Sequence, residues 1–266
     1  MKEKEMIKNE ANKKGQITIF IIIAVVIVGG VIAIFLVSDK ARGVIDRITG
    51  AEFDVKADLK NCIENNKEIK EKISVISSQG GSTNPQANYM YEGKKFEYLC
   101  YTNQNFDTCI MQQPMILNKV ESEINKQIAF NVNECFKSTK SKLENRGYST
   151  SLVNGDTSTK LIPESLIIKS DISLTASRNG KNTYTDFEFR IPSQLYELVM
   201  LSTSILNFEA RYGDSDPAIY MTLYPDIKVE KEKQGDGTTL YFVSDRNTGE
   251  QFNFASRSLV YHVGYG

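Results

Sequence analysis

A run of uncharged, apolar residues near the amino terminus constrains this chain more than any other feature of its sequence. Residues 17–37 read ITIFIIIAVVIVGGVIAIFLV. As a helix that rises ~1.5 Å per residue, this run would extend about 32 Å, which matches the ~30 Å hydrocarbon core of a bilayer. The run is apolar on every face, whereas a core helix of a soluble protein has one apolar face. We therefore expect residues 16–38 to form a single transmembrane helix in contact with membrane lipid.

The length of the run and its flanks predict retention and orientation. A secretory signal peptide has an apolar region of about 7–15 residues that ends in a small-residue cleavage site. This run is longer and leads into Ser38-Asp39 without such a site, so we expect it to remain in the mature protein. Basic residues collect on the cytoplasmic side of a span. Five lysines precede the run, against three basic residues close behind it, which favours a cytoplasmic amino terminus and an extracellular carboxyl-terminal domain.

The junction Lys13-Lys14-Gly15-Gln16, followed by Ile17-Thr18-Ile19-Phe20, resembles the class III signal peptide of archaeal type IV pilin-like proteins. The resemblance covers about residues 1–37. It implies that a class III signal peptidase cuts on the cytoplasmic side, between Gly15 and Gln16. Major pilins of that family usually carry Glu at the fifth mature position, where this chain has Phe20. The departure favours a minor pilin-like subunit or a solitary surface anchor, with pilin-like or other surface proteins as partners. The span also resembles those of uncharacterised archaeal membrane-anchored proteins.

Four cysteines lie beyond the apolar run, and an even number outside a membrane predicts two disulfides. They are Cys62, Cys100, Cys109 and Cys135. Of the three possible connectivities we favour Cys100–Cys109 as a local bridge and Cys62–Cys135 as a bridge between two helices. No C-x-x-C spacing is present, which argues against a zinc site. Four reduced thiols are the alternative, and would be preferred if the orientation were reversed.

Hydrophobic periodicity predicts an α+β fold beyond the span. Apolar residues recur at helical spacing over 54–78, 114–146 and 192–212. A tyrosine-rich hairpin is expected over 89–101, and strands at 165–177, 183–191, 219–230, 239–244 and 251–262. The predicted fold is helices packed on antiparallel β-sheet and hairpins in an extracytoplasmic domain. The expected organisation is a basic cytoplasmic leader (1–15), the transmembrane helix (16–38), a helical stalk (39–78) and the α+β domain (79–266).

The chemistry-bearing residues do not form a known catalytic motif. The only histidine, His262, has no nucleophile or orienting acid near it in sequence, so we expect no His-based catalysis. The turns at Asp214-Ser215-Asp216 and Asp236-Gly237 offer oxygens to Ca²⁺ but do not match the spacing of an EF-hand loop. A net charge of −1 provides no basic field for nucleic acid. We expect no cofactor, no metal and no enzymatic activity.

Two functions from different classes fit these features. The first is a non-enzymatic, membrane-anchored protein of the archaeal cell surface. The alternative is an anchored binding or sensory module for a small ligand, a glycan or a partner surface, for which the hairpin at 89–101 is the sequence support. An apolar pocket ringed by polar groups would favour the alternative. An extracytoplasmic hydrolase would need carboxylates that the fold gathers in a cleft.

Overall fold

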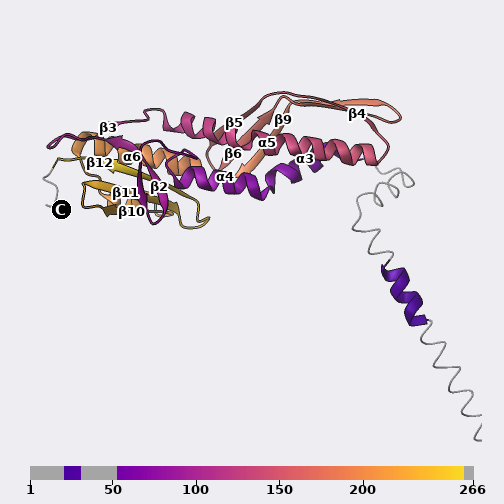
Figure 1. The fold of residues 1–266 in the computed structure, drawn as a ribbon, viewed down its shortest axis with the longest axis horizontal. Coiled ribbons are helices and arrows are strands. Elements are labelled where there is room, and N and C mark those ends of the chain that lie inside the picture. The colour runs from indigo at the N-terminus through magenta and orange to yellow at the C-terminus, as the bar shows by residue number, and fades with distance from the viewer. Residues whose placement is uncertain (1–20, 31–52, 261–266) are drawn as a thin grey trace, which may run out of the picture. The chain divides into compact units, whose positions relative to one another are not determined.

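The computed structural model describes residues 21–30 and 53–260 (Figure 1). The helices of the second range are α3 (Val55–Glu64), α4 (Lys67–Ser78), α5 (Ile116–Asn145), α6 (Leu195–Tyr212) and α7 (Pro217–Leu223). The strands are β1 (Asn88–Tyr91), β2 (Lys94–Tyr101), β3 (Ile110–Met111), β4 (Ser149–Val153), β5 (Thr157–Ile162), β6 (Ser165–Ser170), β7 (Ser173–Ser177), β8 (Lys181–Tyr184), β9 (Phe187–Pro192), β10 (Ile227–Lys233), β11 (Thr238–Asp245) and β12 (Gln251–Arg257). The expected α+β class is confirmed.

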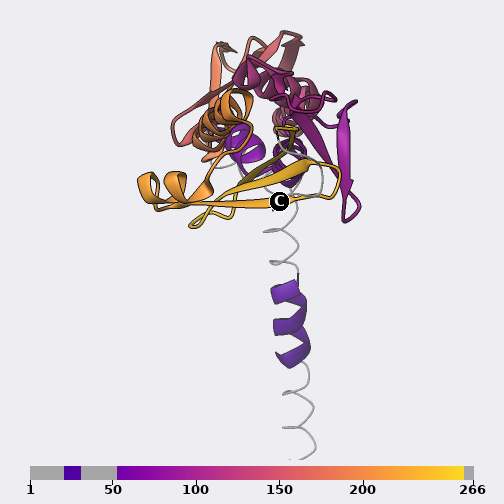
Figure 2. The same ribbon diagram turned by 90° about the vertical axis from the view of Figure 1, so that its left-hand side faces the viewer.

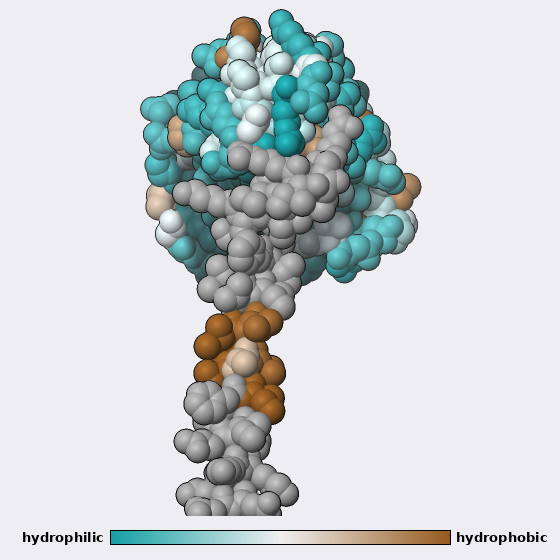
Figure 3. Space-filling model, turned by 90° about the vertical axis from the view of Figure 1, so that its right-hand side faces the viewer, coloured by the Kyte–Doolittle hydropathy of each residue, from teal (hydrophilic) through white to brown (hydrophobic). Residues whose placement is uncertain are grey.

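Residues 21–30, which lie within the apolar run, are helical, and their side chains are exposed. Figure 3 colours this stretch almost entirely as hydrophobic. Within the residues that the structure describes, no helix combines the length and the apolar character needed to cross a bilayer. The rest of the expected transmembrane helix, 16–20 and 31–38, lies outside the described residues, as do the leader 1–15 and residues 39–52 of the expected stalk.

Contacts along the chain divide it into two compact units. The described residues of the smaller unit include 53–54, 140–151 and 176–182. Within it, the Arg146 guanidinium lies 4.3 Å from the centre of the Phe53 ring, and the Arg178 guanidinium lies 5.6 Å from that of Tyr148. Gly147 ends α5 with a positive φ of 85°, a conformation that glycine adopts without strain.

The larger unit contains a layer of helices in which α3 and α4 run alongside α5 (Figure 1). The single helix expected over 54–78 is two helices, because Asn66 starts α4 by accepting a hydrogen bond from the Ile69 amide (3.2 Å). The apolar positions of both helices are nevertheless buried as expected: Val55, Leu59, Ile63, Ile69, Ile73 and Ile76. The described part of the expected stalk is therefore part of the packed body.

The main sheet of the larger unit has the strand order β1-β2-β12-β11-β10, with β3 paired to β2. Its pairs are antiparallel, as expected, except β2 with β12, which is parallel. Alternation of apolar residues predicts strands but not the direction in which distant strands meet. Helices α4 and α6 contact β12, and α6 also contacts β11. In Figure 2 the hairpin β1–β2 stands at one side of this sheet.

A second sheet, β5-β6-β9, has β6 in its centre. Helix α5 contacts this sheet through Glu121, which accepts a hydrogen bond from the Leu161 amide (2.8 Å). Helix α3 contacts the edge strand β9 through Glu64, which accepts one from the Arg190 amide (3.1 Å). Strands β4 and β5 were not predicted from the sequence. The ranges 165–177 and 183–191, each expected as one strand, are two strands each, and the start of 219–230 is helix α7.

Candidate functional site

The four cysteines form two disulfides, the same two pairs that the sequence favours. Cys62 of α3 is bonded to Cys135 of α5, and Cys100 of β2 to Cys109, which precedes β3. No described cysteine is free. The processing residues Gly15 and Gln16 lie outside the described residues, and so does His262.

Three tyrosine hydroxyls of the hairpin form hydrogen bonds with residues of other segments. The Tyr91 hydroxyl donates to Glu232 of β10 (2.9 Å), and the Tyr89 hydroxyl donates to Gln234 (3.3 Å). The Tyr98 hydroxyl shares a hydrogen bond with Thr238 (2.8 Å). The Tyr91 bond joins β1, at one edge of the sheet, to β10 at the other, and the Tyr98 bond joins β2 to β11. The geometry therefore gives the tyrosines a structural role.

The acidic side chains of the turn at Asp214-Ser215-Asp216 form ion pairs and hydrogen bonds within the chain. Asp214 forms ion pairs with Lys231 (2.6 Å) and Lys233 (3.4 Å), and the lysines lower the pKa of its carboxyl group even though burial acts in the opposite direction. Asp216 caps α7 by accepting from the Ala218 amide (2.9 Å). Over the described residues, no group of three or more His, Cys, Asp or Glu side chains is placed to hold a metal ion.

A cavity of about 350 Å³ lies near α7 and gathers four carboxylates, Glu164, Glu197, Asp226 and Asp245. Asp245 accepts from the amides of Asn247 (3.0 Å) and Thr248 (2.7 Å), and so shapes the turn between β11 and β12. Glu197 accepts from the Glu164 amide (3.1 Å). These bonds account for the positions of two of the four carboxylates, Asp245 and Glu197.

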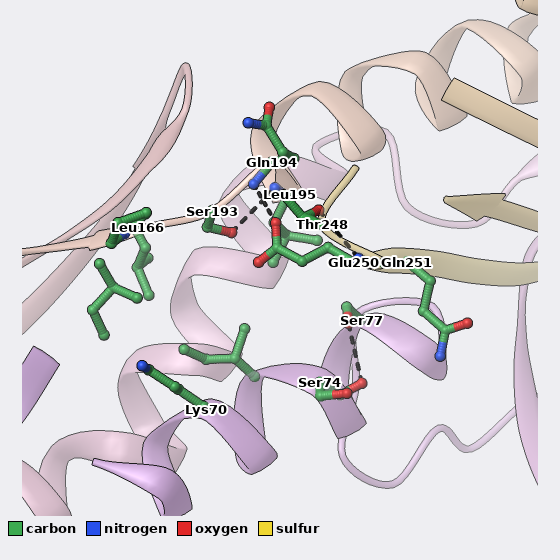
Figure 4. A pocket seen from close by; sticks show the side chains of 14 residues that line it. Lys70, Ser74, Ser77, Leu166, Ser193, Gln194, Leu195, Thr248, Glu250 and Gln251 are labelled. Atoms are coloured by element: carbon green, nitrogen blue, oxygen red, sulfur yellow. Dashed lines mark hydrogen bonds between the residues drawn. The ribbon is translucent and has the colours of Figure 1, made fainter. Parts of the chain in front are cut away.

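A larger cavity, about 410 Å³, lies within the larger unit where three distant segments meet (Figure 4). Helix α4 forms one wall, the β9–α6 connection a second, and the β11–β12 turn a third. Buried apolar side chains contribute to its lining: Ile73, Leu166, Ile191 and Leu195. Hydroxyls and amides of Ser74, Ser77, Ser193, Gln194, Thr248 and Gln251 supply the polar part. The cavity is an apolar pocket edged with hydrogen-bonding groups, the type that small ligands occupy.

Local hydrogen bonds fix the polar edge of this cavity. The Ser193 hydroxyl accepts from the Leu195 amide (3.2 Å) at the start of α6, and the Glu250 amide donates to the Thr248 hydroxyl (3.3 Å). One carboxylate oxygen of Glu250, Oε2, accepts from the Gln194 amide, which joins the β11–β12 turn to the β9–α6 connection. The edge is therefore preorganised by bonds that do not involve a ligand.

Two charged groups that line the cavity, those of Lys70 and Glu250, can still form hydrogen bonds with a ligand. No residue in the described part of the chain donates to the second Glu250 oxygen, Oε1. The Lys70 ammonium forms no ion pair or hydrogen bond with any described side chain. Figure 4 places Lys70 on the α4 wall and Glu250 on the wall formed by the β11–β12 turn. Sequence reasoning missed both residues, because their segments are 180 positions apart and no motif marks either one.

Compared with protein-family models, curated proteins and solved structures, the chain has no match. Two features of the chain's own geometry bear on its function: the pair of disulfides and the cavity between α4, α6 and the β11–β12 turn.

Proposed function

We propose that this chain is a non-enzymatic protein of the archaeal cell surface, anchored through residues 16–38 and carrying its α+β module outside the membrane. The observation that carries the proposal is the pair of disulfides, which leaves no described thiol free. Disulfides persist in oxidising, extracytoplasmic environments and are rare in the cytosol. The apolar run and the lysines before it supply the anchor and its orientation. The resemblance of residues 13–20 to a class III signal peptide supports a minor pilin-like subunit or a solitary anchor.

Amine labelling of intact cells tests the orientation. A membrane-impermeant amine reagent should modify exposed lysines of the module, such as Lys94 and Lys181, in unbroken cells. A cytoplasmic protein of the same cells serves as the negative control. Modification of these lysines only after the membrane is permeabilised would contradict the outside location.

Alkylation after acid quenching tests the disulfides in the same cells. Denatured protein should take up no maleimide before reduction and four equivalents after it, because every cysteine is paired. Uptake of four equivalents without reductant would mean that the thiols are reduced in the cell, and the extracytoplasmic assignment would fail.

A second function, binding of a small ligand by the anchored module, is favoured by the cavity of about 410 Å³. Small-molecule sites are typically concave, have volumes of ~300–1,000 Å³ and combine an apolar lining with a few placed polar groups. This cavity has that size and composition. The hairpin at 89–101 gives no such support, because three of its tyrosine hydroxyls bond within the fold.

A further inference from the structure

The charges of the cavity narrow the class of ligand that it can take. Lys70 offers an ammonium group, and Glu250 offers a carboxylate oxygen that no described residue uses. Ile73, on the same helix as Lys70, and Ile191 and Leu195, at the β9–α6 connection, contribute to the apolar lining. A complementary ligand carries a carboxylate, an ammonium group and an apolar part.

We propose that this cavity binds an apolar α-amino acid in its zwitterionic form, free or within a dipeptide. The inference rests on the proposed ligand-binding function and names its substrate class. The ligand carboxylate faces Lys70, the ligand ammonium group faces Glu250 Oε1, and the apolar side chain contacts Ile73 and its neighbours. Each charged group then gains a charge-assisted hydrogen bond, the stronger kind of hydrogen bond in proteins.

The same lining disfavours two other ligand classes. Among the described residues that line the cavity none is aromatic, and aromatic faces are the usual platform for a sugar ring. In the described lining, Lys70 is the one cation that a phosphate would meet, and the Glu250 carboxylate would repel the phosphate. A zwitterion satisfies both charged groups at once.

Titration calorimetry on the full chain, purified in detergent, tests the proposal. L-Leucine and L-leucyl-L-leucine are the probes. Leucinamide, which lacks the carboxylate, and N-acetyl-leucine, which lacks the ammonium group, are the matched analogues. We expect saturable binding of leucine or its dipeptide, and at least about tenfold weaker binding of each analogue, since one charge-assisted hydrogen bond is lost.

Substitutions of Lys70 and Glu250 test the contact of each residue with the ligand. Lys70→Gln should weaken leucine about tenfold while leaving leucinamide unchanged, and Glu250→Gln should weaken leucine while leaving N-acetyl-leucine unchanged. Glu250→Gln retains an oxygen that can accept from the Gln194 amide, so the turn is kept. Lys67→Gln and Glu92→Gln, exposed positions outside the cavity, are the controls and should bind leucine as the natural chain does.

Several outcomes would overturn the proposal. They are the absence of leucine and dipeptide binding up to millimolar concentration, equal binding of both analogues, and loss of binding in the control variants. Thermal unfolding of each variant checks that its fold is intact. Because binding is measured on purified protein, failure here leaves the surface location untouched, and a cytoplasmic location would leave the binding result valid.

Discussion

Glu209 brings a carboxyl group into the interior of the larger unit. It lies on α6 with 1% of its surface exposed, and it accepts hydrogen bonds from the Tyr241 hydroxyl and from that of Ser256 (3.2 Å). Burial disfavours the charged form and raises the pKa of the Glu209 carboxyl group above its ordinary value near 4.5, with Asp214 adding to the rise. The hydrogen bonds from Tyr241 and Ser256 act in the opposite direction.

This raised pKa predicts how stability depends on pH. The folded state holds the Glu209 proton more tightly than the unfolded state. The resulting stabilisation is fully present below the unfolded pKa, near 4.5, and is lost as the pH rises through the folded pKa. Glu209→Gln removes this titration, so the free energy of unfolding of the variant minus that of the natural chain should increase with pH across that window. Chemical denaturation at a series of pH values measures the difference.

The matched control for this titration is Glu92→Gln, a change at an exposed turn position. It gives the effect of a Glu-to-Gln change at the surface, with which the Glu209→Gln profile is compared. A Glu209→Gln profile parallel to that of Glu92→Gln would show that the pKa of Glu209 is the same in the folded and unfolded states.

At the scale of elements, the two disulfides close loops of very different length. Cys62–Cys135 joins α3 to α5 over a sequence separation of 73, and Cys100–Cys109 spans 9. A longer closed loop restricts the unfolded chain more, which corresponds to about 4 kcal/mol for the first bridge and about 3 kcal/mol for the second. Replacing both cysteines of the α3–α5 bridge by Ser should therefore reduce the free energy of unfolding more than replacing the other pair.

Urea denaturation of the two double variants, each beside the natural chain in the same detergent, gives this comparison. The reverse order of stability losses would mean that strain or residual structure in the unfolded chain outweighs loop closure.

An element can be predicted from the sequence when the residues that define it lie close together along the chain. Helix α5 was predicted over 114–146 and observed over Ile116–Asn145, because its apolar residues repeat at helical spacing. The break before α4 depends on one capping side chain, that of Asn66, inside a pattern that otherwise continues. Pro217 after Asp216 is a signal for the start of a helix. The prediction of a strand at 219–230 did not take this signal into account.

The candidate site was not predictable in the same way. Lys70 is an exposed residue of α4 at the border of the cavity, and the sequence does not distinguish it from the other lysines of that helix. Glu250 follows a polar turn. Only the packing of α4 beside β12 and the β11–β12 turn brings the two residues to one cavity. The cysteine pairs were predictable, since two of the four sit on apolar helix faces and the other two are close in sequence.

For the whole molecule, the resemblance at residues 13–20 predicts that the mature chain starts at Gln16. Mass spectrometry of protein isolated from its native membrane should detect a peptide that begins there and none that contains the leader. Gly15→Leu, which alters the residue before the expected cut, should leave the leader attached, whereas Glu3→Gln should be processed normally. An intact Met1 in the natural chain would contradict a pilin-like subunit.

The bond between Cys62 and Cys135 also decides how the module carries mechanical tension. Tension applied to the chain before α3 reaches Cys62 within α3. The disulfide then transmits the tension to α5. The chain between the two cysteines, which includes α4 and the hairpin β1–β2, is thereby shielded from the load. If the chain is anchored at its amino terminus, as we propose, tension from the anchor leaves Lys70 and the α4 wall of the cavity unloaded.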